Sequence, residues 1–124
     1  MLDELRKGNY TRILGLDPGL RRAGWGIVDY DGSNIRHVAH GTIIPSHKLD
    51  LVERLVVLHQ DLLKIVEDFK PTTAAAEETF VNQNGTSTLK LGLARGALLL
   101  APALSKIAIT EYAPNRIKKS LSFF

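Results

Sequence analysis

The chain has 124 residues, of which 44% are hydrophobic and 23% are charged, which is enough apolar material for one folded domain. It contains no cysteine, which excludes disulfides, zinc–thiolate sites and cysteine nucleophiles, and no apolar run reaches the roughly 20 residues that span a bilayer. The net charge of +3 at pH 7 permits a polyanionic partner without requiring one.

The first third of the chain is expected to contain three strands. The first ten residues are polar and are expected to be an extension, followed by one domain over residues 11–124. Apolar and alternating runs predict strands over residues 12–17, 24–30 and 34–44. Pro18-Gly19 and Asp31-Gly32 are typical turn sequences, so the connections are short. Three strands joined by short turns predict an antiparallel meander.

A change of period then predicts a helix. Apolar residues recur at spacings of three and four over residues 51–69. Asp50 is a suitable N-cap, Glu53 completes a capping-box pair, and Pro71 is expected to end the helix. Residues 72–77 are expected to form a short buried strand. Because a helix separates this strand from the meander, we expect the strand to run parallel to one of the earlier strands.

The rest of the chain is expected to alternate helices and strands. Loop residues occupy positions 79–85, and a second helix is expected to begin at Thr86 or Ser87 and to reach about Ala101. A further strand is expected over residues 106–112, and Pro114 is suited to the first turn of a third helix. This order of elements predicts an α/β domain, a mixed sheet with helices on its faces.

Two acidic residues stand at the ends of two predicted strands. Asp17 ends the first strand and Glu77 ends the strand over residues 72–77. If these strands are parallel neighbours, the two carboxylates converge at the edge where sites form in α/β sheets, and a divalent cation such as Mg²⁺ or Mn²⁺ would relieve their repulsion. Paired metals can promote phosphodiester cleavage. The alternatives are that these acids cap helices or lie in solvated turns, and that Glu78 rather than Glu77 faces the site.

Basic residues gather at two places. Arg21 and Arg22 lie together in a glycine-rich turn, and Arg116, Lys118 and Lys119 lie close together near the C-terminus. Either group could contact a polyanion, and either could be ordinary solvated charge.

The four histidines are scattered along the sequence. His37 and His40 are three residues apart on a predicted strand, so their side chains are expected to point to opposite faces. We therefore expect no histidine metal site.

Four sequence blocks resemble the RuvC family of bacterial Holliday-junction resolvases, in the family's order and spacing. They are I-L-G-L-D-P-G at residues 13–19, A-E-E-T-F at 76–80, L-K-L-G-L-A-R-G at 89–96, and E-Y-A-P with the following I-K-K at 111–119. The resemblance implies a ribonuclease H-like fold, a mixed five-stranded sheet with flanking helices. It also implies a cytoplasmic bacterial homodimer that cuts four-way DNA junctions with Mg²⁺, two ions per site, and works with the branch-migration proteins RuvA and RuvB.

The resemblance also implies roles for individual residues. Asp17 and Glu77 match the first two catalytic acids, which hold the metal, and the spacing to Phe80 favours Glu77 over Glu78. Phe80 matches an aromatic placed against bases at the junction centre, and Lys118 matches a basic residue near the active site. DNA contacts are also expected of Arg116 and Lys119. The helix that carries L-K-L-G-L-A-R-G is expected at or near the dimer contact.

The sequence departs from the family near its C-terminus. The family uses two further acids, a D-x-x-D pair on a later helix, and after Glu111 this sequence has no Asp or Glu. We therefore expect a truncated domain whose last helix is missing and whose cleavage activity is in doubt. The alternatives to an active endonuclease are an inactive junction-binding module, a non-functional remnant, or a related YqgF-type nuclease, although the block at 89–96 resembles RuvC specifically.

Overall fold

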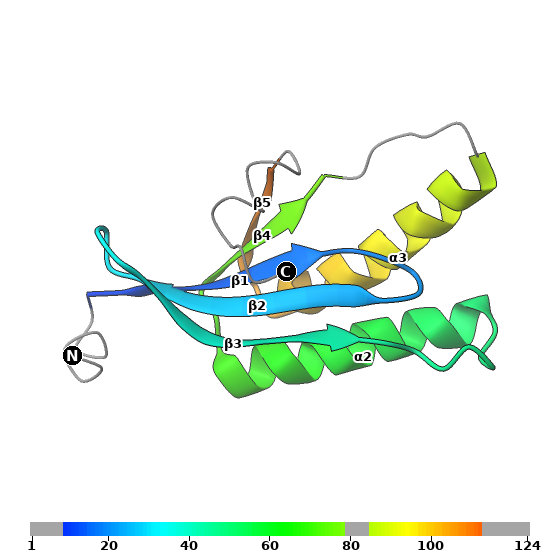
Figure 1. Ribbon diagram of the computed structural model, residues 1–124, viewed down its shortest axis with the longest axis horizontal. Helices are drawn as coiled ribbons and strands as arrows, with labels where there is room; N and C mark the ends of the chain where they lie inside the picture. The colour runs from blue at the N-terminus through cyan, green and yellow to red at the C-terminus, as the bar shows by residue number, and fades with distance from the viewer. Residues whose placement is uncertain (1–8, 79–84, 113–124) are drawn as a thin grey trace.

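The computed structural model describes residues 9–78 and 85–112, which form five strands and two helices (Figure 1). In chain order these are β1 (Thr11–Asp17), β2 (Ala23–Tyr30), β3 (Ile35–Ile43), α2 (Leu51–Phe69), β4 (Thr73–Glu77), α3 (Gly85–Leu104) and β5 (Ala108–Tyr112). The element order and the α/β class agree with the sequence prediction. The helix expected from Pro114 and most of the polar N-terminal extension lie outside the described residues.

The strands form one mixed sheet in the order β3-β2-β1-β4-β5. The first three strands pair antiparallel, which confirms the predicted meander. β4 pairs parallel with β1, and β5 pairs parallel with β4, so each helix is the crossover between two parallel strands. The two strands that end in the predicted acids are therefore direct neighbours.

Both helices pack on the same face of the sheet (Figure 1). Alternate residues of β1 and β4 point into this layer, and Leu14, Leu16, Ala74 and Ala76 are almost fully buried there. They meet the buried stripe of α2, which contains Leu58, Leu62 and Val66, and that of α3, which contains Ala94, Leu98 and Ala101. The intervening residues of the strands point to the opposite face.

The ends of α2 follow the local sequence. The Asp50 carboxylate accepts a hydrogen bond from the backbone N–H of Glu53 at 2.9 Å, and the Glu53 carboxylate accepts one from the backbone N–H of Asp50 at 3.1 Å. The predicted capping box is therefore confirmed. At the other end Lys70 adopts a left-handed conformation with φ of 52°, and its N–H donates to the carbonyl of Val66.

α3 extends three residues beyond the expected end at Ala101. Pro102 lies inside its last turn and is buried. A proline so close to the end costs the helix one backbone hydrogen bond, and burial of its ring against the core offsets this loss. Arg95 connects α3 to β5 through an ion pair of 3.2 Å with Glu111.

Neither described helix is long and apolar enough to cross a membrane.

Candidate active site

Asp17 and Glu77 lie side by side at the carboxyl ends of β1 and β4. The parallel register pairs Leu16 with Ala76, and Asp17 and Glu77 are the next residues of the two strands. Because Leu16 and Ala76 point into the helix-covered layer, the two acids point to the opposite face of the sheet. Both residues are half-buried, and one Glu77 carboxylate oxygen, Oε2, is buried. The convergence expected from the sequence is therefore present.

The same register separates Glu77 from its neighbour. Glu78 lies beyond the end of β4, where its backbone N–H donates to the carbonyl of Tyr112 at 2.7 Å, and the residue is exposed. Glu77 is thus the acid on the face that Asp17 occupies, and Glu78 is not part of this pair.

A hollow of about 300 Å³ lies beside Asp17 on this face. Its wall is formed by the β1–β2 loop and by the adjoining ends of β2 and β3, with side chains from Arg22, His40 and Thr42. Gly24 and Gly41 also line it. The sequence indicated Arg22 as a loop cation that could contact a polyanion and His40 only as a histidine unsuited to a metal site, and nothing in it singled out Thr42. Their positions depend on strand pairing that no local pattern reveals.

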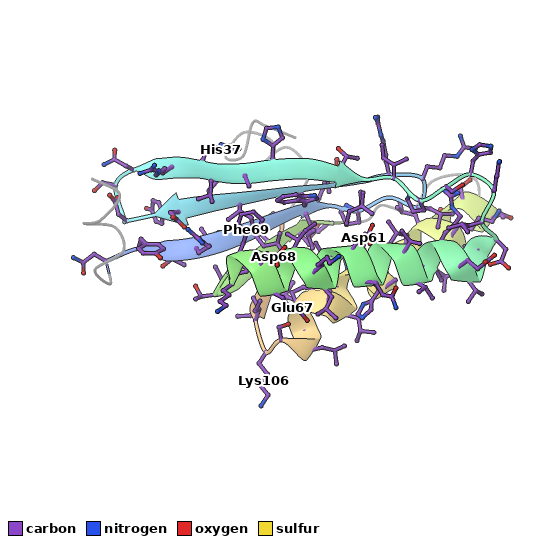
Figure 2. All side chains as sticks on the ribbon, turned by 90° about the horizontal axis from the view of Figure 1, so that it is seen from below. His37, Asp61, Glu67, Asp68, Phe69 and Lys106 are labelled. Atoms are coloured by element: carbon purple, nitrogen blue, oxygen red, sulfur yellow. The ribbon has the colours of Figure 1, made fainter. Side chains whose placement is uncertain are left out.

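The prediction that His37 and His40 face opposite sides is wrong. His37 Nε2 and His40 Nδ1 are 2.9 Å apart, and the ring centroids are 5.0 Å apart. The pairing of β2 with β3 contains an irregularity: Ile27 pairs with Ala39 and Val28 pairs with His37. The extra residue on β3 reverses the alternation, as a β-bulge does, and brings both rings to one face. His37 lies on the side of β3 away from α2 (Figure 2).

The donor set at the strand ends fits a hard divalent cation in part. Asp17 and Glu77 offer carboxylate oxygens, which Mg²⁺ and Mn²⁺ prefer. Within residues 9–78 and 85–112, no group of three or more His, Cys, Asp or Glu side chains could hold a metal ion. The described residues can therefore supply two protein ligands, and water and a substrate phosphate would have to supply others. The remaining predicted site residues, Phe80, Arg116, Lys118 and Lys119, lie outside the described part of the chain.

Two acids thus lie at neighbouring strand ends of a mixed sheet in an α/β domain, on the face opposite the two helices. The family model for "Crossover junction endodeoxyribonuclease RuvC" matches residues 13–122. The chain therefore belongs to the RuvC family, and its mixed five-stranded sheet with flanking helices is the architecture that the sequence resemblance implied.

Curated relatives of that name are similar in sequence to nearly the whole of this chain. The protein from Xanthobacter autotrophicus is 56% identical over 113 residues, which cover 91% of this chain and 67% of the relative. The protein from Bradyrhizobium sp. strain BTAi1 is 49% identical over 111 residues, which cover 90% of this chain and 63% of the relative. The chain thus spans about two thirds of the length of the relatives it matches.

Solved structures show the same fold. Thermus thermophilus RuvC in complex with a Holliday junction substrate has a TM-score of 0.78 and 26% identity, with 91% of this chain and 71% of that chain covered. The yeast mitochondrial Holliday junction resolvase Ydc2 has a TM-score of 0.63 at 15% identity, with 96% of this chain and 57% of that chain covered. The second likeness concerns the fold alone.

Proposed function

We propose that this chain carries the junction-binding surface and two catalytic carboxylates of a RuvC-type endonuclease, which hydrolyses phosphodiester bonds in four-way DNA junctions. The observation that carries the proposal is the placement of Asp17 and Glu77 at adjacent strand ends in a member of this family. Junction DNA as the substrate is supported by the likeness to a RuvC that was solved with a Holliday junction. The 49% and 56% identities to RuvC proteins favour this function over that of a YqgF-type nuclease.

Each residue has a distinct task in this proposal. Asp17 and Glu77 would hold Mg²⁺, for which Mn²⁺ could substitute. Two such ions in a complete site would supply Lewis acidity for activating water and for balancing charge on the leaving oxygen. Lys118 adds a positive charge beside the phosphate. Phe80 stacks on unpaired bases at the junction centre, and Arg116 and Lys119 contact backbone phosphates.

Two carboxylates are a small ligand set for two divalent ions. Mg²⁺ demands near-octahedral geometry and gives up its waters reluctantly, so two carboxylates alone should bind it weakly. We therefore propose that a D-x-x-D helix of the kind used by the family completes the site from the facing side. Residues 1–124 assayed without such a helix should then bind junctions with little or no cleavage.

The first experiment tests the two acids. We expect Asp17→Asn and Glu77→Gln each to abolish metal-dependent nicking of a synthetic four-way junction and to leave junction binding intact, because each removes an anionic metal ligand and no DNA contact. The assay uses the 124-residue chain and the same chain extended by a RuvC segment that carries the D-x-x-D helix. Mg²⁺ and Mn²⁺ are compared.

Glu78→Gln is the matched control, since it makes the same chemical change one residue away on an exposed side chain. It should nick like the parent chain. Normal nicking by Glu77→Gln together with lost nicking by Glu78→Gln would reverse the assignment. Equal nicking by the extended and unextended chains would contradict the need for further carboxylates.

We further propose a homodimer that forms through α3. Exposed apolar residues follow one stripe of this helix at helical spacing: Leu89, Leu93, Leu100 and Leu104 are 67%, 41%, 49% and 62% exposed. Gly96 falls on the same stripe and Gly92 beside it, and a methyl group added at either glycine would meet no atom of the described chain within 4 Å. A stripe of leucines with small residues allows a second helix to approach closely. A dimer would place two active sites on one junction.

The cellular setting is proposed from the family alone. The named curated relatives come from bacteria, and the sequence resemblance implies the branch-migration proteins RuvA and RuvB as partners. We propose that the protein acts with them on recombination intermediates in the bacterial cytoplasm.

A further inference from the structure

Two more hollows adjoin the one that contains Asp17. Arg22 lines both the 300 Å³ hollow at Asp17 and a neighbouring hollow of about 430 Å³. Leu20, Arg21 and Lys90 line the 430 Å³ hollow and also a third one of about 710 Å³. The three hollows therefore share walls and follow one another across the β1–β2 loop, from Asp17 toward the first turns of α3 and α2. We call the second and third hollows together the basic groove.

The charged side chains that line the basic groove are all cationic. Its cationic side chains are Arg21, Arg22, Arg54 and Lys90, with His47 beside them, and among the described residues no Asp or Glu lines either hollow. The neighbouring acids Asp50 and Glu53 are held on each other's backbone amides by the capping box. A polyanion in the groove would therefore meet cations without facing carboxylates.

The walls of the basic groove are fixed by backbone contacts. Arg54 donates from Nη1 to the carbonyl of Ser46 at 3.0 Å and from Nη2 to the carbonyl of Leu20 at 3.3 Å, so one guanidinium joins the β1–β2 loop to the β3–α2 connection. At Gly19 a side chain would overlap the carbonyl oxygen of Arg22. The loop that carries Arg21 and Arg22 is thus tightly folded, which lowers the cost of ordering these cations on a ligand.

We propose that the basic groove binds the sugar-phosphate backbone of the DNA strand that continues from the phosphate at Asp17. This proposal rests on the proposed function and adds a path for the DNA outside the cleavage site. A single anion would need one hollow, whereas a chain of phosphates, with one charge per ~3.4 Å of rise along a strand, suits cations distributed over successive hollows. Arg21 and Lys90, shared by both hollows, are the central phosphate contacts.

The test is the salt dependence of DNA binding by the full 124-residue chain without divalent metal. The proteins are the wild type, Arg21→Ala, Lys90→Ala and the double variant, and the DNAs are a four-way junction and a linear duplex. Loss of one phosphate contact lowers the slope of log Kobs against log salt by about 0.9. We expect that change for each single variant and about twice that for the double variant. Arg21→Lys should retain the wild-type slope, because it keeps the charge.

Lys64→Ala is the control, because Lys64 is an exposed lysine on α2 ten residues after Arg54, or about 15 Å along the helix. It removes the same charge away from the groove and should retain the wild-type slope. If the slopes of log Kobs against log salt for Arg21→Ala and Lys90→Ala equal that for Lys64→Ala, the proposal that the basic groove binds DNA is wrong. If the wild type bound the linear duplex as tightly as the junction, the proposed function would be contradicted. The salt slopes of the variants would still show whether DNA binds in the basic groove.

A second measurement does not depend on affinity. The chain has no cysteine, so Lys90→Cys and Lys64→Cys can each carry a photoactivatable maleimide at one position. Crosslinking of the junction from position 90 and not from position 64 supports the groove. Equal crosslinking from both positions, or none from position 90, overturns it.

Discussion

Arg12 joins three segments that are far apart in the chain. Its Nε and Nη2 donate to Asp29 Oδ1 and Oδ2 at 2.8 and 3.0 Å, and its Nη1 donates to the carbonyl of Phe69 at 3.0 Å. Asp29 is 2% exposed, so its carboxylate has lost almost all contact with water. The bidentate ion pair with Arg12 compensates for that lost hydration. The hydrogen bond to Asp29 raises the pKa of Arg12 above its ordinary value. Arg12 thus ties β1 to β2 and to the end of α2.

Arg12→Met should therefore destabilise the fold strongly. The substitution leaves Asp29 buried with no counter-charge, and such losses cost about 3 kcal/mol or more. Urea unfolding of the two proteins measures the difference in the free energy of unfolding. The double variant Arg12→Met/Asp29→Leu should recover most of it, since an apolar pair of similar size carries no desolvation penalty. A loss below about 0.5 kcal/mol in the single variant would show that the pair contributes only as a surface ion pair does.

At the scale of residues, the acids could be predicted and the rest of the site could not. Asp17 and Glu77 are marked by a local signal, an acid directly after a short apolar run, and the parallel pairing of their strands brought them together. His40 and Thr42 lack such a signal. They reach the hollow beside Asp17 because β2 pairs with β3 through an irregular register, and one extra residue in a strand leaves no mark in the pattern of apolar residues.

At the scale of elements, the ends of helices were predictable where side chains determine them. The start of α2 depends on Asp50 and Glu53, whose spacing is visible in the sequence. α3 ends instead at a left-handed Lys106 with φ of 60°, where the N–H of Ile107 donates to the carbonyl of Pro102 and that of Lys106 to the carbonyl of Ala103, and a lysine does not mark such an end in the sequence as a glycine would. The predicted end at Ala101 was three residues too early for this reason.

Asp50→Ala should destabilise the protein by about 1 kcal/mol. It removes the acceptor for the Glu53 amide and half of the capping box, and N-cap losses of this kind cost ~0.5–2 kcal/mol. Asp50→Ser keeps a side-chain oxygen and should lie within a few tenths of a kcal/mol of the wild type. Both are measured by urea unfolding at equal m values. Equal losses in the two variants would attribute the effect to charge near the helix terminus rather than to the cap.

At the scale of the whole molecule, the order of the elements along the chain restricted the possible strand orders of the sheet but left more than one open. The meander follows from two short turns, and the helix over residues 51–69 requires a parallel partner for the next strand. β1 and β3 are the two edge strands of the meander, so β4 could have paired with either. The structure uses β1, and this choice places Asp17 next to Glu77. Had β4 paired with β3, two strands would separate the strands that carry the two acids.

The exposed stripe of α3 is the feature of the whole molecule with the clearest consequence for assembly. Its buried face, with Ala94 and Leu98, already packs on the sheet, so the leucines of the stripe add nothing to the core of one chain. Contiguous exposed apolar side chains of this kind mark interaction sites. A second copy of α3 would bury both stripes at once, in the self-complementary way of two-fold dimers.

Leu93→Glu should therefore convert the proposed dimer into a monomer. The variant places a carboxylate at the centre of the stripe, where a dimer would bury it without a partner, and removing an unpaired charge from water costs several kcal/mol. Light scattering after size exclusion should give twice the 13.7 kDa chain mass for the wild type and 13.7 kDa for the variant. Ile35→Glu is the control, because Ile35 is 54% exposed on β3 and lies off the stripe, so it should stay dimeric. Far-UV circular dichroism of both variants checks that the fold is retained. A dimeric Leu93→Glu chain, or a wild type that is monomeric throughout the concentration range, would place the stripe outside any contact between copies, and two active sites could then not be held on one junction through α3.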